Sequence, residues 1–279
     1  MRKSIAVGSA ALLAAGGLLA ATPANAADAT VSVLHGIPAD ALGGAAATVD
    51  VYANGNKVID DFTPGQLETL TVPGGSYDLV VAAGDSTDAS TPILEASGVE
   101  VPAGANATVT ANLNEAGDAG ALSVFVNDTA TIAAGEGRVT VRHIAAAPEV
   151  TISADGNALG NIANTSGNQE LKADVPAKTY AVAVAPASGG DAVFSTDLPA
   201  AEGANTIVYA WGSLADGSFA VATQSIDGLG SAPAGVPAGE VGLAADGAAF
   251  APNWVLAVML AAGIGLLVST QRFLARDEN

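Results

Sequence analysis

The sequence contains no cysteine. A chain without thiols can form no disulfide, carry no lipid-attached cysteine and offer no thiolate to a metal or a substrate. Aromatic residues are also scarce, at 4%. Large platforms that stack sugars need exposed Trp or Tyr side chains, so we expect none here.

Basic residues are few: 9 Lys and Arg stand against 28 Asp and Glu, for a net charge of -19. Such a surface repels nucleic acid and anionic lipid, because it has no basic patch that could release their counterions. We therefore exclude nucleic acid as a partner. The acidity agrees with affinity for divalent cations, with a salt-rich habitat or simply with solubility, and the sequence leaves these three open.

Motifs for catalysis and cofactor binding are missing as well. No G-x-S-x-G elbow and no Gly-rich phosphate loop that opens a helix occur in the chain. Asp60 and Asp61 are adjacent, so on a strand they face opposite sides and make no acid/base pair. Residues 85–88 (DSTD) lack the ligand spacing of a calcium loop and are interpreted as a solvated turn. The sequence therefore predicts no catalysis, no cofactor and no metal.

The two histidines, His35 and His143, are the candidate site residues. They occupy matching positions near the end of similar apolar runs, and either could be a metal ligand or a general base. A metal site needs three or four ligands, and no second His or Cys lies near either one. We interpret both as partly buried histidines that form hydrogen bonds in the bend after a strand.

The N-terminal segment, residues 1–26, has the pattern of a signal peptide. Two basic residues follow Met1, an apolar stretch rich in Ala, Leu and Gly runs from 5 to 21, and Ala24 and Ala26 form an A-x-A cleavage site. We expect cleavage after Ala26 and export of the chain.

The C-terminal segment predicts a transmembrane helix over residues 253–271. Its length suits the hydrocarbon core of a bilayer, Trp254 suits the outer interface, and Arg272 and Arg276 suit the inner one. Residues 272–279 then form a cytoplasmic tail. The predicted location is the cell membrane, crossed once, with the domains outside.

A flexible stalk, residues 228–252, is expected before this helix, because the segment is rich in Gly, Ala and Pro and poor in large apolar side chains. Within it, residues 243–247 (LAADG) resemble an L-A-x-T-G sorting signal for a sortase. Asp246 stands where that signal has Thr. We prefer a retained helix over covalent attachment to the cell wall, and the alternative stays open.

Between the two ends the sequence occurs twice. Residues 31–35 (VSVLH) return as 139–143 (VTVRH), and the tetrapeptide ANGN at 53–56 is echoed by ADGN at 154–157. A repeat of this length is a whole domain rather than a solenoid unit. The sequence predicts two domains, at 29–128 and 137–227, joined through residues 128–137.

Each copy shows short alternating runs separated by Gly, Pro, Asn or Asp, which is typical of strands and turns. In the run 49–53, Val49, Val51 and Ala53 are expected to point inward, and Asp50 and Tyr52 outward. Asn-Gly or Asp-Gly then predicts a tight hairpin turn. Later, a Val-Pro pair is followed by a tyrosine, Tyr77 or Tyr180, whose hydroxyl is expected to bond back to a nearby carbonyl. We predict an all-β chain of two tandem β-sandwich domains, immunoglobulin-like or prealbumin-like, with the strand order open.

Three motifs of the first copy carry a resemblance: V-x-V-x-H at 31–35, V-D-V-Y-A-N-G at 49–55 and V-P-G-G-S-Y-D-L-V-V at 72–81. Together they resemble the bacterial domain of unknown function numbered 4397, a family often found exported and in tandem. The resemblance runs over 30–128 and more faintly over 138–226. It implies a fold and a location, and it implies no reaction.

These features favour an exported, membrane-anchored cell-surface protein that presents two β-sandwich domains for binding, adhesion or envelope spacing, without catalysis. The expected partner is an extracellular protein, a glycan or an envelope component, and the loop 39–47 is the candidate contact region. The rival functions are an extracellular hydrolase, a calcium-dependent surface module and a purely structural envelope protein.

Overall fold

The computed structural model describes residues 27–231. The expected signal peptide with Ala24 and Ala26, most of the stalk, the transmembrane segment 253–271 and the tail lie outside the described residues. Among the residues that are described, no helix is long and apolar enough to cross a membrane.

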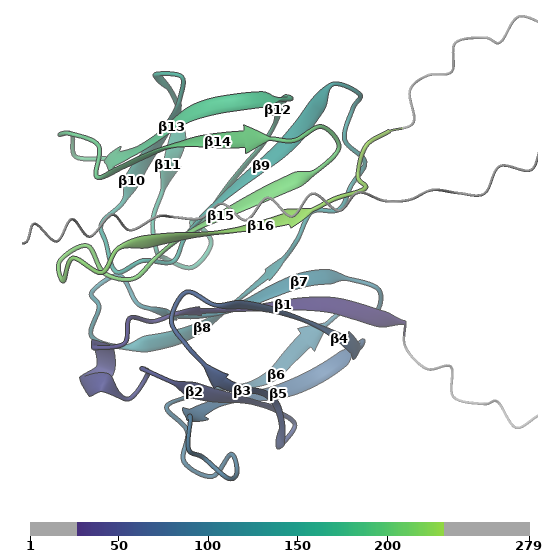
Figure 1. Ribbon diagram of the computed structural model, residues 1–279, viewed down its shortest axis with the longest axis vertical. Coiled ribbons are helices and arrows are strands. Elements are labelled where there is room, and N and C mark those ends of the chain that lie inside the picture. Colours follow the sequence, from purple (N-terminus) through teal and green to yellow (C-terminus); the bar gives the residue numbers. More distant parts are fainter. Residues whose placement is uncertain (1–26, 232–279) are drawn as a thin grey trace, which may run out of the picture. The chain divides into compact units, whose positions relative to one another are not determined.

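Within this range the chain is all-β, as predicted: sixteen strands and one short 3₁₀ helix (Figure 1). The first eight strands and the helix η1 (Ala41–Gly44) form the first sandwich. Its strands are β1 (Asp28–Gly36), β2 (Val49–Ala53), β3 (Asn56–Phe62), β4 (Leu67–Pro73), β5 (Gly75–Ala83), β6 (Leu94–Val101), β7 (Asn106–Leu113) and β8 (Gly120–Val126).

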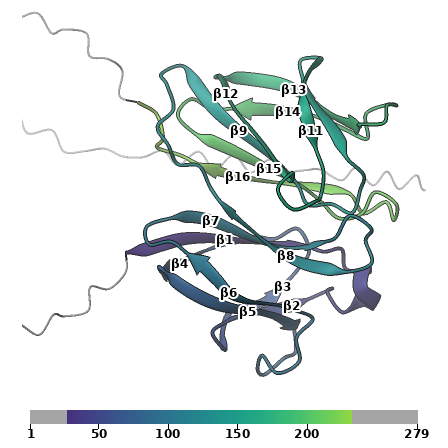
Figure 2. The same cartoon turned by 180° about the vertical axis from the view of Figure 1, so that it is seen from behind.

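The second sandwich repeats this series of strands. Seen from behind, its strands lie in the same two-layer arrangement as those of the first (Figure 2). They are β9 (Glu136–His143), β10 (Val150–Ala154), β11 (Asn157–Ile162), β12 (Glu170–Pro176), β13 (Lys178–Pro186), β14 (Phe194–Ala200), β15 (Asn205–Trp211) and β16 (Ala220–Ile226).

The strand order is the same in both sandwiches. The first has sheets β4-β1-β7-β8 and β3-β2-β5-β6, and the second has β12-β9-β15-β16 and β11-β10-β13-β14. One pair in each sandwich is parallel, β1 with β7 and β9 with β15, while the remaining pairs are antiparallel. In the immunoglobulin arrangement the first strand pairs with the second. Here it pairs with the fourth and seventh, so of the two expected arrangements the prealbumin-like one remains.

The hairpin predicted from the repeated turn signal is confirmed in both copies. Asn54 and Gly55 have φ angles of 49° and 77°, and Asp155 and Gly156 have 50° and 79°. Positive φ at both central residues defines the turn whose twist matches that of the flanking strands. It joins β2 to β3 and β10 to β11.

The tyrosines after the Val-Pro pairs also behave as expected. The Tyr77 hydroxyl donates to the Pro73 carbonyl at 2.6 Å, and that of Tyr180 donates to the Pro176 carbonyl at 3.0 Å. Each bond closes the corner between two strands of different sheets, which assigns both side chains to structure.

The expectation that one face of β2 lies in solvent is wrong. Asp50 and Tyr52 are as buried as Val49 and Val51, because Lys57 and Ser86 cover the outer face of β2. The Asp50 carboxylate lies 2.7 Å from the Lys57 ammonium and accepts the Ser86 hydroxyl at 2.7 Å. Lys57 in the hairpin partner β3 and Ser86 in the loop after β5 thus bury the Asp50 carboxylate, which strand alternation alone would place in solvent.

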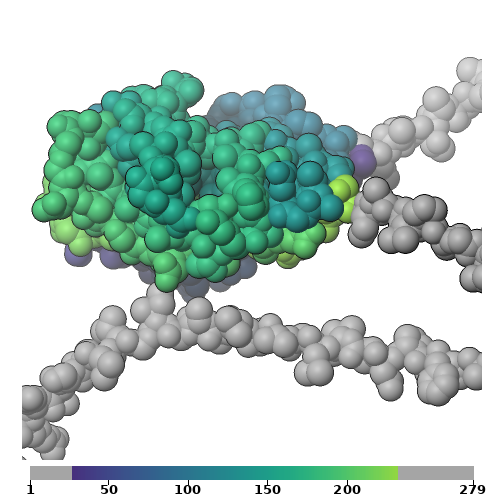
Figure 3. All heavy atoms as spheres, turned by 90° about the horizontal axis from the view of Figure 1, so that it is seen from above, coloured from purple at the N-terminus to yellow at the C-terminus, as the bar shows by residue number. Residues whose placement is uncertain are grey.

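Each sandwich has its own apolar core, and a third cluster joins the two. This junction cluster consists of four buried side chains: Leu34 from β1, Ile144 after β9, and Ile207 and Tyr209 from β15. Both sandwiches belong to one compact unit. Figure 3 shows the second sandwich from above, with its atoms coloured teal to green. The two copies are therefore joined by packed side chains as well as by the linker.

Candidate binding site

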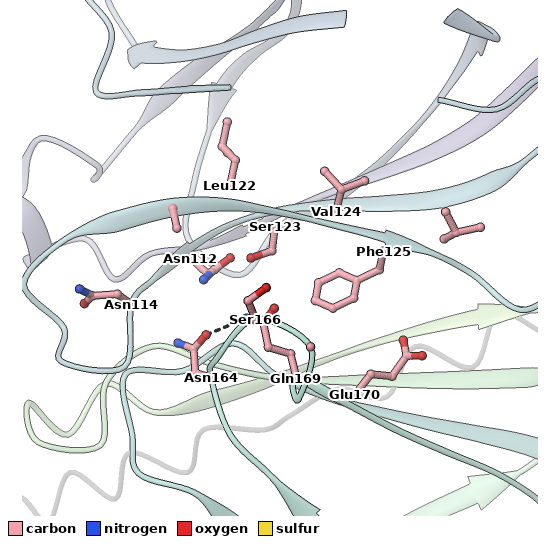
Figure 4. A pocket seen from close by; sticks show the side chains of 13 residues that line it. Asn112, Asn114, Leu122, Ser123, Val124, Phe125, Asn164, Ser166, Gln169 and Glu170 are labelled. Atoms are coloured by element: carbon pink, nitrogen blue, oxygen red, sulfur yellow. Dashed lines mark hydrogen bonds between the residues drawn. The ribbon is translucent and has the colours of Figure 1, made fainter. Parts of the chain in front are cut away.

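A cleft with a volume of about 790 Å³ opens where the two sandwiches meet. One wall is β8 with the end of β7, and the other is the loop between β11 and β12 (Figure 4). Its lining mixes amides, hydroxyls, one carboxylate and a few apolar groups. The lining residues are Asn112, Asn114, Ala121, Leu122, Ser123, Val124, Phe125, Val126, Asn164, Ser166, Gly167, Gln169 and Glu170.

The first wall owes its character to strand alternation. Ser123 and Phe125 point toward the opposite loop, whereas Val124 points away from it (Figure 4). β8 is the last strand of its sheet and pairs only with β7 among the described strands. The cleft therefore has an unpaired strand edge along one side.

The second wall is fixed to the first sandwich by Asn164. Its amide nitrogen donates to the Leu113 carbonyl at 2.8 Å and to the Ala145 carbonyl at 2.9 Å. Its oxygen accepts the Gln169 amide at 2.8 Å. One buried side chain thus holds the end of β7, the segment after β9 and the loop before β12 in a defined arrangement.

Arg142 lies behind the cleft with a side chain that is only 1% exposed. Its Nε donates to Glu170 Oε2 at 2.7 Å, and its Nη1 donates to the Tyr209 hydroxyl at 2.9 Å. The guanidinium also lies 4.3 Å from the centroid of the Phe125 ring, within the range of a cation–π interaction. This one cation therefore contacts both walls, and its charge is matched by the carboxylate of Glu170.

Polar contacts continue across the junction from Tyr209. Its hydroxyl lies 2.6 Å from Gln224 Oε1 and 3.0 Å from Thr108 Oγ1, and the Gln224 amide donates to Ser32 Oγ at 2.9 Å. Burial raises the pKa of the Tyr209 phenol above its usual 10.0, opposed in part by the nearby Arg142 charge. Strands β1 and β7 of the first sandwich are thereby linked to β15 and β16 of the second.

The histidines are placed elsewhere, and neither lines the cleft. His35 lies within β1 and His143 ends β9, each only 1% exposed. Because a carbonyl can only accept, Nε2 carries the proton in both: His35 donates to Ala46 at 2.9 Å and His143 to Pro148 at 3.0 Å. His35 Nδ1 also accepts the Ile37 amide at 3.3 Å. His35 thus uses both ring nitrogens within the fold, and each ring ties its strand to the following loop.

These histidines predict a stability that depends on pH. Burial lowers the pKa of both rings below 6.5, and the hydrogen bonds to Ala46 and Pro148 offset this only in part. As the pH falls below about 6.5, the unfolded chain takes up protons that the folded chain does not, so the free energy of unfolding decreases. We expect the melting temperature to be lower at pH 5.5 than at 7.5. The double variant His35→Gln/His143→Gln should show a flatter profile over this range, and an unchanged slope would contradict the assignment.

The other acidic candidates are engaged in local structure. Asp60 accepts Lys57 at 2.8 Å, Asp61 donates its backbone amide to Asp50, and Asp88 accepts the Ser90 amide at 2.9 Å. Within residues 27–231, no three or more His, Asp or Glu side chains are grouped to hold a metal ion.

Sequence reasoning missed Arg142, Glu170, Tyr209 and the cleft itself. One signal was available: where the first copy has Leu34, the second has Arg142 at the same place before the histidine. An arginine in an apolar strand pattern needs a partner when it is buried. The partner, Glu170, is distant in the sequence and could not be identified from it.

The fold and the cleft define a class: a tandem β-sandwich protein with an opening at the junction of its domains. Residues 29–153 match the family model described as "Domain of unknown function (DUF4397)". The match spans the first sandwich and continues to Ser153 in β10, and it confirms the resemblance seen in the motifs of the first copy.

None of the curated proteins matches the chain. Among solved structures, the crystal structure of a candidate cell adhesion protein from Bacteroides uniformis is similar at 12% sequence identity. That similarity covers 73% of this chain and 97% of the other, with a TM-score of 0.22.

Proposed function

We propose that this chain is an exported, membrane-anchored cell-surface protein that binds an extracellular protein, a glycan or an envelope component without catalysis. The observation that carries the proposal is the polar cleft of about 790 Å³ at the junction. Sites of this size that are lined by a few placed polar groups are typical of ligand recognition. The surface location rests on the sequence of residues 1–26 and 253–271.

The lining supports recognition of a polar partner. The hydroxyls of Ser123 and Ser166 and the side-chain oxygen of Gln169 make no hydrogen bond to other described residues and face the cleft (Figure 4). Behind them, Asn164 and Arg142 hold the walls through buried bonds. Because the backbone around these groups is already held in place, they lose little conformational entropy when they bind a ligand.

Binding is favoured over hydrolysis by the titratable groups of the cleft. Glu170 is the one titratable side chain in its lining, and Arg142 already engages it at 2.7 Å. General acid/base hydrolysis uses two such groups on either side of the scissile bond. The hydrolase alternative expects a deep polar pocket with converging carboxylates or histidines, whereas the lining of this cleft holds one carboxylate and neither His35 nor His143.

Substitution of Ser166 tests the proposal. Ser166 is exposed in the cleft wall, so Ser166→Arg places a long side chain in the opening at little cost to folding. We expect binding of the full chain to ligands found on glycan and peptide arrays to weaken at least tenfold. Thr87→Arg, on an exposed loop outside the cleft lining, is the matched control and should bind like the unmodified chain. Equal binding by both variants would place recognition elsewhere, with the loop 39–47 as the next candidate.

A further inference from the structure

The cleft follows the backbone of β8 rather than one face of it. Its lining contains six consecutive residues of that strand, 121–126, instead of alternate ones. Alternate residues would mean contact with a single face, because successive side chains point to opposite sides. Among the described residues, no backbone hydrogen bond joins this stretch to any strand other than β7. The opening therefore runs along a free sheet edge.

The phase of the β7–β8 ladder shows which backbone groups are free. Just beyond the C-terminal end of β8, the backbone amide of Asn127 donates to the backbone carbonyl of Asn106 at 2.8 Å. Just before its N-terminal end, the backbone amide of Asn114 donates to the backbone carbonyl of Ala119 at 2.8 Å. In an antiparallel pair, bonded and non-bonded positions alternate, so the odd-numbered residues of β8 bond to β7. The residues that turn their amide and carbonyl groups to the free edge are Leu122, Val124 and Val126.

This edge lacks the features that normally prevent pairing. Its sequence, GALSVFV, contains no charge and no proline. The other outer strands of the first sandwich, β3, β4 and β6, all carry charged side chains. At the start of β8, Leu94 and Leu42 lie close to Gly120 and cover it. Val124 and Val126 remain 41% and 62% exposed. A neutral, exposed, apolar edge is a template for another strand.

We propose that the free edge of β8, from Leu122 to Val126, binds an extended segment of a partner polypeptide as an added strand. The added strand would place apolar side chains beside Val124 and Val126 and basic side chains toward Glu170. This inference rests on the proposed binding function and assigns the class of partner to it. Main-chain bonds supply the affinity in such complexes, and alternate side chains supply the selectivity.

Charge and lining favour a basic peptide over a sugar. The net charge of -19 attracts a cationic segment. Arg142 engages Glu170 through Oε2, and Oε1 of this 32% exposed side chain makes no hydrogen bond to the described residues. Phe125 is the one aromatic residue of the cleft lining and the Arg142 guanidinium lies 4.3 Å from its ring, so the lining offers a sugar little aromatic surface for stacking. The repeating donors and acceptors of a strand edge match a peptide backbone.

A designed peptide tests the proposal on the full chain, purified in mild detergent. The probe is a peptide of about ten residues in which Val and Lys alternate, since a strand lays successive side chains on opposite faces. Two further probes carry N-methyl groups on all Val or on all Lys nitrogens, so that each blocks the donors of one edge. We expect one methylated probe to bind at least tenfold more weakly than the parent, and the other to bind within about twofold of it. Equal binding of the two methylated probes would overturn strand addition, and this comparison needs no protein variant.

A pair of variants locates the edge. Val124→Pro removes an outward amide and leaves the bonds to β7, a position at which edge strands tolerate proline. Val124→Thr keeps the amide and the branched shape. With similar melting temperatures, Val124→Pro should bind the parent probe at least tenfold more weakly than Val124→Thr, and equal affinities would contradict the proposal. If the chain bound a glycan but no peptide, and Ser166→Arg abolished that glycan binding, strand addition would be overturned while the proposed binding function would stand. Binding of neither class would count against the proposed function as well.

Discussion

The variant Arg142→Ala is expected to lower the free energy of unfolding by about 3–5 kcal/mol, near the lower end of that range. The substitution leaves Glu170 without its cation and removes the donor to the Tyr209 hydroxyl. It also opens a void beside Phe125. Because the Glu170 side chain is 32% exposed, water solvates part of its charge, which moderates the loss. Denaturant unfolding of the full chain measures the change.

Lys172→Ala is the matched control. Lys172 lies in β12, the strand of Glu170, and pairs with Asp128, but its side chain is 41% exposed. An exposed pair of this kind contributes about 0–1 kcal/mol. Arg142→Leu, which introduces the residue of the first copy, should cost less than Arg142→Ala because it keeps most of the packing. If Arg142→Ala were as mild as Lys172→Ala, the buried guanidinium would not be what holds the junction.

The features that were predicted correctly from the sequence are local ones. The turn at Asn54 and Gly55 depends on two residues that tolerate positive φ, and both are adjacent in the chain. The bond from Tyr77 to Pro73 spans four residues, so its spacing is also visible in the sequence. Recurrence of both patterns in the second copy made the all-β prediction secure, because the same local signal occurred independently twice.

Sheet order could not be derived in the same way. β1 pairs with β4 on one side and with β7 on the other, and these partners are separated from it by whole strands and loops. Alternation identifies which face of a strand is apolar, but it does not select the neighbouring strand. The immunoglobulin-like and prealbumin-like arrangements therefore remained equally compatible with the sequence.

The cleft was missed because its walls come from both copies. Small polar residues at alternate positions are typical of a solvent-facing sheet surface. Ser32 and Thr108 fit that pattern, yet they are 1% and 0% exposed because the second sandwich covers them. The contact between two similar domains depends on surfaces that neither copy reveals alone. Arg142 in place of Leu34 was the one local departure that marked it.

Leu34→Ala is expected to lower the free energy of unfolding by about 2–5 kcal/mol and to do so for both sandwiches together. Leu34 belongs to the first sandwich and is 0% exposed, but it packs in the junction cluster with Ile144, Ile207 and Tyr209 of the second. Removal of its side chain therefore leaves a cavity between the domains rather than inside one. Scanning calorimetry of the full chain should show one transition for the two sandwiches, shifted to lower temperature.

The double variant Leu34→Ala/Ile207→Ala separates a shared junction from two independent cores. Side chains in contact across one cavity couple by about 0.5–3 kcal/mol, whereas distant ones are additive. Ile152→Ala, in the core of the second sandwich, is the comparison and should add to Leu34→Ala without coupling. Two separate transitions, with only the first displaced by Leu34→Ala, would mean that the sandwiches unfold independently. The width of the cleft would then vary with the contact between the domains, and the loop between β11 and β12 would contribute little to the affinity for a partner bound along β8.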